Sequence, residues 1–305
     1  MLYRTLLSCF LLSTLWSCQS NTVESINENI TRLAQVQADG LLPRNVDIWV
    51  PQAYLDDPEL RVPVLYMHDG QNLFFPEESY TGNTWEVARE IENQIQKGSI
   101  PPCMVVGIWN TKDRWAEYVP EQPFSTFPQD VQDRMTAAEG APKSDRYLDW
   151  LVNDLKPVID KEFRTLTDPA NTFIMGSSMG GLISLYAFVR YPQIFGGAAA
   201  LSPHWPIQGS TPDPEATEAM IKFLTDNMPS LEGKHLYLDH GDQGLDAEYQ
   251  VWQTTFARFM GMRGFINGKD FISLKFPGDN HNEKDWARRF YQPLVYLFPP
   301  ESPVE

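Results

Sequence analysis

The sequence predicts an α/β fold, with a mostly parallel central sheet and helices on both of its faces. Short apolar runs typical of strands alternate along the chain with longer segments of helical periodicity. Several of these runs, such as MVVGIW at residues 104–109, are apolar without interruption, as expected for strands buried on both faces. The length of 305 residues, 42% of them hydrophobic and 21% charged, is typical of one globular domain of this class.

The individual elements follow from these two patterns. Apolar runs predict strands at residues 45–50, 62–67, 104–109, 172–175, 197–201, 235–239 and 271–276. Helical periodicity predicts helices at residues 84–97, 147–163, 180–189, 214–227, 249–261 and 286–298. Residues 117–146 interrupt the alternation, because they contain four prolines and little apolar periodicity. We expect this insertion to act as a lid or substrate-binding flap, with a plain surface insertion as the alternative.

The first eighteen residues are typical of a signal peptide. One positive charge, Arg4, precedes an apolar run that is too short to span a bilayer. The run ends in Leu-Trp-Ser-Cys, which resembles the lipobox of bacterial lipoproteins and implies cleavage before a lipidated Cys18. Residues 1–18 are thus expected to be a signal, residues 19–32 a polar tether and residues 33–305 the folded domain. The chain would lie in the bacterial cell envelope, lipid-anchored at the outer membrane, or be periplasmic or secreted if the signal is cut elsewhere.

Charge and cysteine content exclude several classes of function. The net charge of −16 repels the phosphates of nucleic acids and anionic lipids, so the only membrane contact expected is the lipid anchor. Of the three cysteines, only Cys103 lies in the body of the chain, which excludes a disulfide framework and a cysteine-ligated zinc site. The histidines show no metal-ligand spacing, and no metal site is expected.

The motif Gly176-Ser177-Ser178-Met179-Gly180-Gly181 follows a predicted strand and begins a predicted helix. This is the G-x-S-x-G nucleophile elbow, in which small residues allow a sharp turn that exposes the central serine. The free N–H groups at the helix start stabilise negative charge beside that serine. Ser178 is therefore the candidate nucleophile, and Ser177 is not.

A nucleophilic serine needs a histidine base and an acid that orients it, in the chain order Ser, Asp or Glu, His. Among five histidines, His281 follows the last predicted strand and precedes the terminal helix, where the base belongs. The acid is expected in the loop HGDQGLDAEY after the preceding strand. Asp246 is the preferred candidate there, with Asp242 as the alternative. For the oxyanion hole, the backbone N–H groups of Met179 and of Gln71, in the loop HDGQN, are the expected donors.

The combination of VLYMHDGQNLF, GSSMGG and FPGDNH resembles the putative-esterase family of α/β hydrolases, over roughly residues 44–298. This family includes enterochelin, feruloyl and acetylxylan esterases, S-formylglutathione hydrolases and mycolyltransferases. The resemblance implies an α/β-hydrolase fold, a Ser178, Asp246 and His281 triad, and no cofactor. It also implies that GIWNTKDRWAEYVP lies beside the substrate pocket, so Trp109, Asn110 and Arg114 are expected substrate contacts. His204, which follows the strand predicted at residues 197–201, is a further expected substrate contact.

These observations predict a serine esterase that acts through an acyl-enzyme on small-molecule or carbohydrate esters. Feruloyl or acetyl esters of extracellular carbohydrates and siderophore esters are the expected substrates. An acyltransferase with the same triad and a non-catalytic binding lipoprotein on a hydrolase scaffold remain as alternatives.

Overall fold

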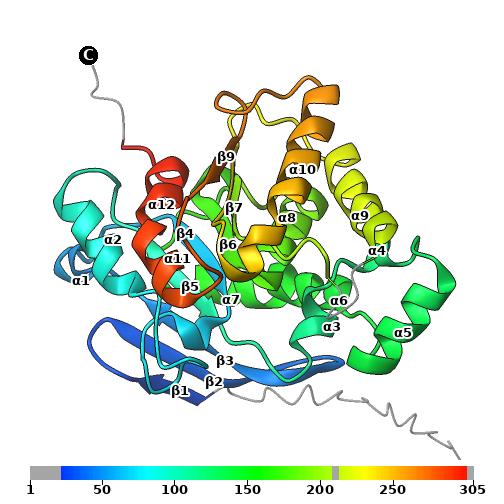
Figure 1. The fold of residues 1–305 in the computed structure, drawn as a ribbon. Helices are drawn as coiled ribbons and strands as arrows, with labels where there is room; N and C mark the ends of the chain where they lie inside the picture. The colour runs from blue at the N-terminus through cyan, green and yellow to red at the C-terminus, as the bar shows by residue number, and fades with distance from the viewer. Residues whose placement is uncertain (1–21, 208–212, 301–305) are drawn as a thin grey trace, which may run out of the picture.

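The computed structural model describes residues 22–207 and 213–300. Within them the chain forms a nine-stranded sheet with helices on both faces, in the order β1-β2-β3-β5-β4-β6-β7-β8-β9 (Figure 1). Every neighbouring pair from β5 to β9 is parallel, whereas the pairs β1–β2, β2–β3 and β3–β5 are antiparallel. The predicted α/β class is confirmed.

All seven predicted strands are present, and two further strands precede them. The strands are β1 (Thr22–Ser25), β2 (Ile30–Ala38), β3 (Leu41–Trp49), β4 (Val64–His68), β5 (Met104–Ile108), β6 (Thr172–Ser177), β7 (Gly197–Leu201), β8 (His235–His240) and β9 (Ile272–Lys275). Every residue of β4, β5, β6 and β7 is buried, as their uninterrupted apolar runs predict.

The helices are α1 (Gln52–Asp56), α2 (Val87–Gln96), α3 (Arg114–Tyr118), α4 (Glu121–Phe124), α5 (Gln129–Glu139), α6 (Ser144–Trp150), α7 (Lys156–Glu162), α8 (Met179–Arg190), α9 (Pro214–Asp226), α10 (Gln250–Met262), α11 (Glu283–Arg289) and α12 (Tyr291–Leu297). The predicted helix at residues 147–163 is α6 and α7 joined by a π-helical turn, and the one at 286–298 is divided between α11 and α12. No helix in the described ranges is both long and apolar enough to cross a membrane.

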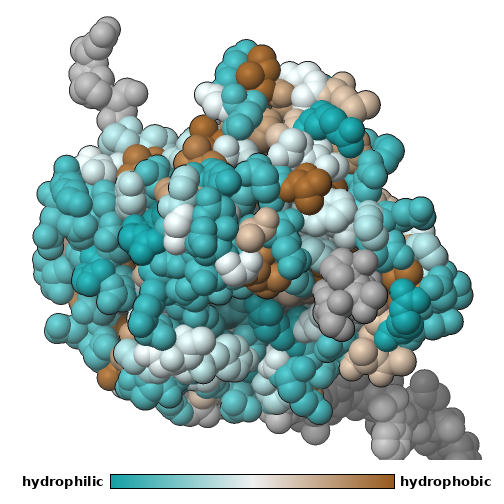
Figure 2. Space-filling view, viewed as in Figure 1, coloured by the Kyte–Doolittle hydropathy of each residue, from teal (hydrophilic) through white to brown (hydrophobic). Residues whose placement is uncertain are grey.

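Side chains alternate between two hydrophobic cores, one on each face of the sheet. Val64 and Tyr66 of β4 face a core that α6 to α10 cover, whereas Leu65 and Met67 face a core closed by α2, α11 and α12. In Figure 1 these two helical layers flank the strands. On the surface shown in Figure 2, hydrophobic side chains are scattered among hydrophilic ones.

The polar tether predicted for residues 19–32 is wrong from Thr22 onwards. In the described part of the chain, β1 is an edge strand that pairs with β2 alone, and its residue Val23 is 64% exposed. In β2, Leu33 and Val36 are buried while the residues between them are more exposed. A strand with one face open to solvent does not need a continuous apolar run, so the polar residues at 22–32 are compatible with pairing in the sheet. Cys18 and the signal predicted for residues 1–18 lie outside the described residues.

The insertion at residues 117–146 is folded rather than an extended loop. It contains α4, α5 and the start of α6, and it buries Phe124, Phe127, Val131 and Met135 in the main core. Its first residue, Glu117, accepts two hydrogen bonds from Arg44 of β3, at 2.7 and 2.9 Å, and both side chains are fully buried. The insertion is therefore anchored to the sheet at its start.

Candidate active site

Ser178 lies at the sharp turn between β6 and α8. Its backbone angles, φ 55° and ψ −125°, fall in a region that residues with a side chain rarely adopt. The turn depends on the glycines beside it, because a Cβ on Gly176 would stand 2.6 Å from the backbone of Gly180. This is the geometry that the G-x-S-x-G motif predicts.

The start of α8 supplies N–H groups beside Ser178. Met179 is the first residue of this helix, and the first N–H groups of a helix have no acceptor within it. The Ser178 N–H itself donates to the Leu201 carbonyl at the end of β7, at 2.9 Å, which fixes the turn to the neighbouring strand. The helix dipole also favours negative charge at this position.

His281 and Asp246 meet at the carboxyl ends of the strands. The Nδ1 of His281 lies 2.6 Å from Oδ1 of Asp246, so the imidazole donates its Nδ1 proton to the carboxylate. The imidazole also packs edge-on against Trp286 and Tyr249, with ring centroids 4.9 and 5.6 Å away. These contacts hold the ring and leave Nε2 as the nitrogen that can take up a proton.

Asp246 is fully buried, yet it is stabilised as a carboxylate. Its second oxygen, Oδ2, accepts from the Ser202 hydroxyl at 2.6 Å and from the Gly241 N–H at 2.7 Å. Burial alone would raise the pKa of Asp246, but these bonds and the bond and charge of His281 hold it below its ordinary value. Asp242, the alternative acid, is partly exposed and instead accepts from the Gly278 N–H at 2.8 Å.

Ser202 and Arg289 support the acid, and the sequence analysis did not identify either. The Ser202 oxygen accepts from Trp286 Nε1 at 3.1 Å and from Arg289 Nη2 at 2.8 Å, so its own proton is directed to Asp246. The buried Arg289 also donates to Asp239 and Asp279. Ser202 directly follows β7, which pairs with β6, the strand that leads to Ser178. A polar residue at the carboxyl end of a strand next to the nucleophile was the signal in the sequence that could have identified Ser202.

Ser178 and His281 line one cavity of about 240 Å³. Its lining is mostly polar and comes from loops at the carboxyl ends of the strands and from the start of α11. The lining residues are Asp69, Asn72, Tyr80, Arg114, Ser177, Ser178, His281, Glu283 and Trp286.

Two of the predicted substrate contacts, Asn110 and Arg114, form a network around Asp69. Arg114 donates to both oxygens of Asp69, at 2.8 and 2.7 Å, and the Asn110 amide donates to Oδ1. Burial opposes ionisation, but the Arg114 charge and these bonds lower the pKa of Asp69. Arg114 lines the cavity, whereas the buried Asn110 reaches it through the hydroxyl of Tyr80, which donates to Asn110 Oδ1.

Other predicted site residues do not line this cavity. The Trp109 indole donates to Asp47 at 2.8 Å on the antiparallel side of the sheet, and His204 contacts the hydroxyl of Tyr249. Gln71 is buried in the turn Gly70–Asn72, and its side-chain oxygen accepts from the Asn110 N–H at 3.2 Å. Among the described residues that line this cavity, none belongs to the insertion at residues 117–146.

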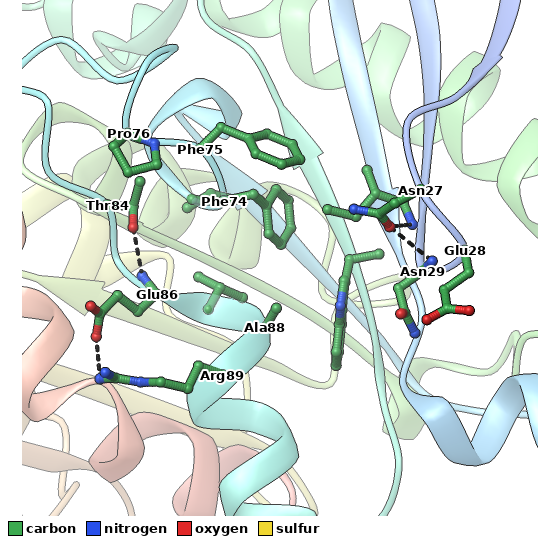
Figure 3. A pocket seen from close by; sticks show the side chains of 14 residues that line it. Asn27, Glu28, Asn29, Phe74, Phe75, Pro76, Thr84, Glu86, Ala88 and Arg89 are labelled. Atoms are coloured by element: carbon green, nitrogen blue, oxygen red, sulfur yellow. Dashed lines mark hydrogen bonds and ion pairs between the residues drawn. The ribbon is translucent and has the colours of Figure 1, made fainter.

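A larger cavity of about 610 Å³ lies elsewhere, between the β1–β2 turn, residues 73–76 and the start of α2. Phe74 and Phe75 project into it opposite Asn27, Glu28 and Asn29 (Figure 3). No member of the predicted triad lines it, so its size does not make it the site of the chemistry.

A mostly parallel sheet with a serine elbow, followed by an acid and a histidine after later strands, is the α/β-hydrolase fold. Solved structures share this fold. A ferulic acid esterase is 16% identical with a TM-score of 0.60, covering 88% of this chain and 97% of its own. The enterobactin esterase FES from Shigella flexneri is 16% identical with a TM-score of 0.64, covering 92% of this chain and 61% of its own.

Residues 42–296 match the family described as "Putative esterase", and the chain belongs to this family. A curated relative from Bacillus subtilis, described as "Uncharacterized protein YbbA", is 28% identical over 159 residues. The match covers 52% of this chain and 56% of that protein, so the chain spans little more than half of the relative's length.

Proposed function

We propose that the protein is a serine carboxylic-ester hydrolase in which Ser178, His281 and Asp246 form the catalytic triad. The observation that carries this proposal is the hydrogen bond between His281 Nδ1 and Asp246 Oδ1, at 2.6 Å. The same histidine and Ser178 line one cavity. Because Asp246 fixes the Nδ1–H tautomer, the free Nε2 is available as a general base. Family membership supports the same chemistry.

In the proposed reaction, Nε2 of His281 takes the proton of the Ser178 hydroxyl as its oxygen attacks the ester carbonyl carbon. The N–H groups of Met179 and Gln71 stabilise the oxyanion that forms. The imidazolium then gives its proton to the alcohol oxygen as the carbon–oxygen bond breaks, which leaves an acyl group on Ser178. His281 then takes a proton from water as the water oxygen attacks the acyl carbon, and it gives that proton to the Ser178 oxygen as the acyl–serine bond breaks and the acid is released.

The substrates that we propose are carbohydrate esters carrying feruloyl or acetyl groups, or siderophore esters. The solved structures of a ferulic acid esterase and an enterobactin esterase, which have the same fold, support this choice. The cavity of about 240 Å³ holds one part of such a molecule, while the rest extends beyond it.

The test is hydrolysis of an ester panel by the wild-type chain, Ser178→Ala and Ser177→Ala. The panel contains p-nitrophenyl acetate and butyrate, methyl ferulate, acetylated xylan and a catecholate siderophore. We expect turnover of at least one ester by the wild type and by Ser177→Ala, and none above background by Ser178→Ala. Full activity in Ser178→Ala would reject the proposed nucleophile, and acyl transfer seen only with an added alcohol would favour an acyltransferase.

We also propose that Cys18 carries the lipid anchor of the protein. β1 begins at Thr22, so only residues 19–21 would separate the anchor from the sheet. Labelling with radioactive palmitate in a bacterial host should modify the wild type and not Cys18→Ser. A labelled Cys18→Ser protein would contradict this proposal.

A further inference from the structure

A second carboxylate faces the catalytic cavity beside the base. Glu283 is the first residue of α11, two positions after His281, and it lines the same cavity with 8% of its surface exposed. Its Oε2 accepts from the Thr81 hydroxyl at 3.0 Å. No hydrogen bond from the described part of the chain reaches its Oε1.

Among the residues that the structure describes, the negative charge of Glu283 has no cationic partner. In residues 22–207 and 213–300, no Lys, Arg or His forms an ion pair with Glu283. Asp69, the other carboxylate in this cavity, is paired with Arg114 at 2.7 Å. The lining residues therefore leave one uncompensated negative charge, and it lies near His281. A carboxylate in a largely buried site is most stable when a donor or a positive charge meets it.

The chemistry places one part of the substrate on this side of the cavity. In the proposed reaction, the histidine gives its proton to the oxygen of the leaving alcohol, so the alcohol portion must lie next to His281. Trp286 of α11 packs against His281 with ring centroids 4.9 Å apart, and Glu283, the first residue of the same helix, lines the same cavity. This step rests on the proposed esterase function.

We propose that Glu283 determines specificity for the alcohol portion of the substrate. It favours alcohols that carry a hydroxyl or an ammonium group close to the ester oxygen, because either group stabilises the carboxylate. It disfavours alcohols that carry a carboxylate there, because like charges repel in a site of low exposure. The hydroxyl, as a hydrogen-bond donor, and the ammonium group, as a positive charge, can each stabilise the Glu283 carboxylate, and substrates that carry only one of these groups can distinguish them.

The test uses four acetyl thioesters whose hydrolysis releases a thiol that Ellman's reagent detects. They are acetylthiocholine, its neutral isostere with carbon in place of the ammonium nitrogen, the thioester of mercaptoethanol and the thioester of mercaptopropionate. The full-length wild type is compared with Glu283→Gln, which keeps the side-chain length and an oxygen for Thr81. Thr81→Val is the matched control, because it removes the Thr81 hydrogen bond and retains the Glu283 charge.

We expect the wild type to cleave the ammonium or hydroxyl thioester with a kcat/KM at least about tenfold above that for the carboxylate thioester. Glu283→Gln should lose about tenfold for the favoured substrate and should change the neutral isostere by no more than about twofold. Thr81→Val should change kcat/KM by the same factor for all four thioesters. If Glu283→Gln loses kcat/KM on the ammonium thioester alone, the alcohol portion of the natural substrate is cationic. If the loss is on the hydroxyl thioester, the alcohol portion is a polyol.

Two results would overturn the inference, and the first requires the wild type alone. One is equal wild-type kcat/KM for the neutral, ammonium, hydroxyl and carboxylate thioesters. The other is that Thr81→Val changes the ratio of kcat/KM between the favoured and the carboxylate thioester as much as Glu283→Gln does. That result would assign Glu283 a structural role only. Absence of hydrolysis on all four thioesters and on every ester of the panel described above would instead contradict the proposed esterase function, and the inference with it.

Discussion

Replacing Asp246 by Asn should lower turnover strongly because the structure determines how the new amide is oriented. Oδ2 of Asp246 receives two donors, the Gly241 N–H at 2.7 Å and the Ser202 hydroxyl at 2.6 Å. The Gly241 donor cannot turn away, and the Ser202 oxygen already accepts from Trp286 and Arg289. The Asn carbonyl oxygen must therefore occupy the Oδ2 position, and its NH₂ group must face His281.

An NH₂ group beside Nδ1 of His281 donates a hydrogen bond to that nitrogen. The imidazole proton then moves to Nε2, which can no longer accept the serine proton. Such a tautomer error lowers kcat by about 10⁴-fold in Ser-His-Asp hydrolases, or about 5.4 kcal/mol at about 1.36 kcal/mol per tenfold. We expect a loss of this size for Asp246→Asn, with the hydrogen bonds to Ser202 and Gly241 retained.

The assay is kcat/KM for p-nitrophenyl acetate, with a thermal melt to verify folding. Asp242→Asn is the matched control: its carboxylate is partly exposed and accepts from the Gly278 N–H, so activity should stay within about threefold of wild type. A folded Asp246→Asn protein with activity within tenfold of wild type would refute the reasoning. Equal losses in both variants would do the same.

Two further predictions concern stability, measured by urea unfolding. Burial lowers the pKa of His68 from 6.5 to about 3, so its neutral form stabilises the fold fully above pH 6.5, and this stability is lost as the pH falls toward 3. His68→Phe should reduce the slope of the unfolding free energy between pH 6 and 5 by about 1.2 kcal/mol per pH unit, and an unchanged slope would contradict this. Glu117→Gln should lose about 3–5 kcal/mol, because the buried Arg44 is left with an uncompensated charge. Asp130→Asn, which breaks the exposed pair with Arg134, should cost less than about 0.5 kcal/mol, and equal costs would argue against an anchoring role for Glu117.

The elbow and the proposed acid and base could be predicted because their signals are local. The glycines of GSSMGG are required by a turn within a few residues, and the chain order of acid and histidine follows from the strand order. The structure brings Asp246 to His281, as predicted, and places Asp242 elsewhere. Both residues lie in the loop after β8, and the helical turn at Gly244–Glu248, which the sequence analysis did not predict, places Asp246 rather than Asp242 beside His281.

Other features depend on long-range contacts that no local pattern reveals. The sequence of β1 is mostly polar, that of β2 mixes apolar with polar residues, and pairing through the sheet makes both of them strands. In the insertion, Pro120 and Pro128 directly precede α4 and α5, where proline is tolerated, so prolines that suggested a loop begin helices instead. Ser202 supports Asp246 only because β7 and β8 are neighbours.

The most direct test of the proposed nucleophile is reaction with an organophosphate such as diethyl p-nitrophenyl phosphate, followed by peptide mass spectrometry. The serine oxygen should displace p-nitrophenolate and form a stable phosphate ester. We predict one diethylphosphoryl group on Ser178, formed at the rate at which esterase activity disappears. The modification should be slowed strongly in His281→Ala. Loss of esterase activity with the label on another residue, or full activity after Ser178 is labelled, would contradict the proposed mechanism.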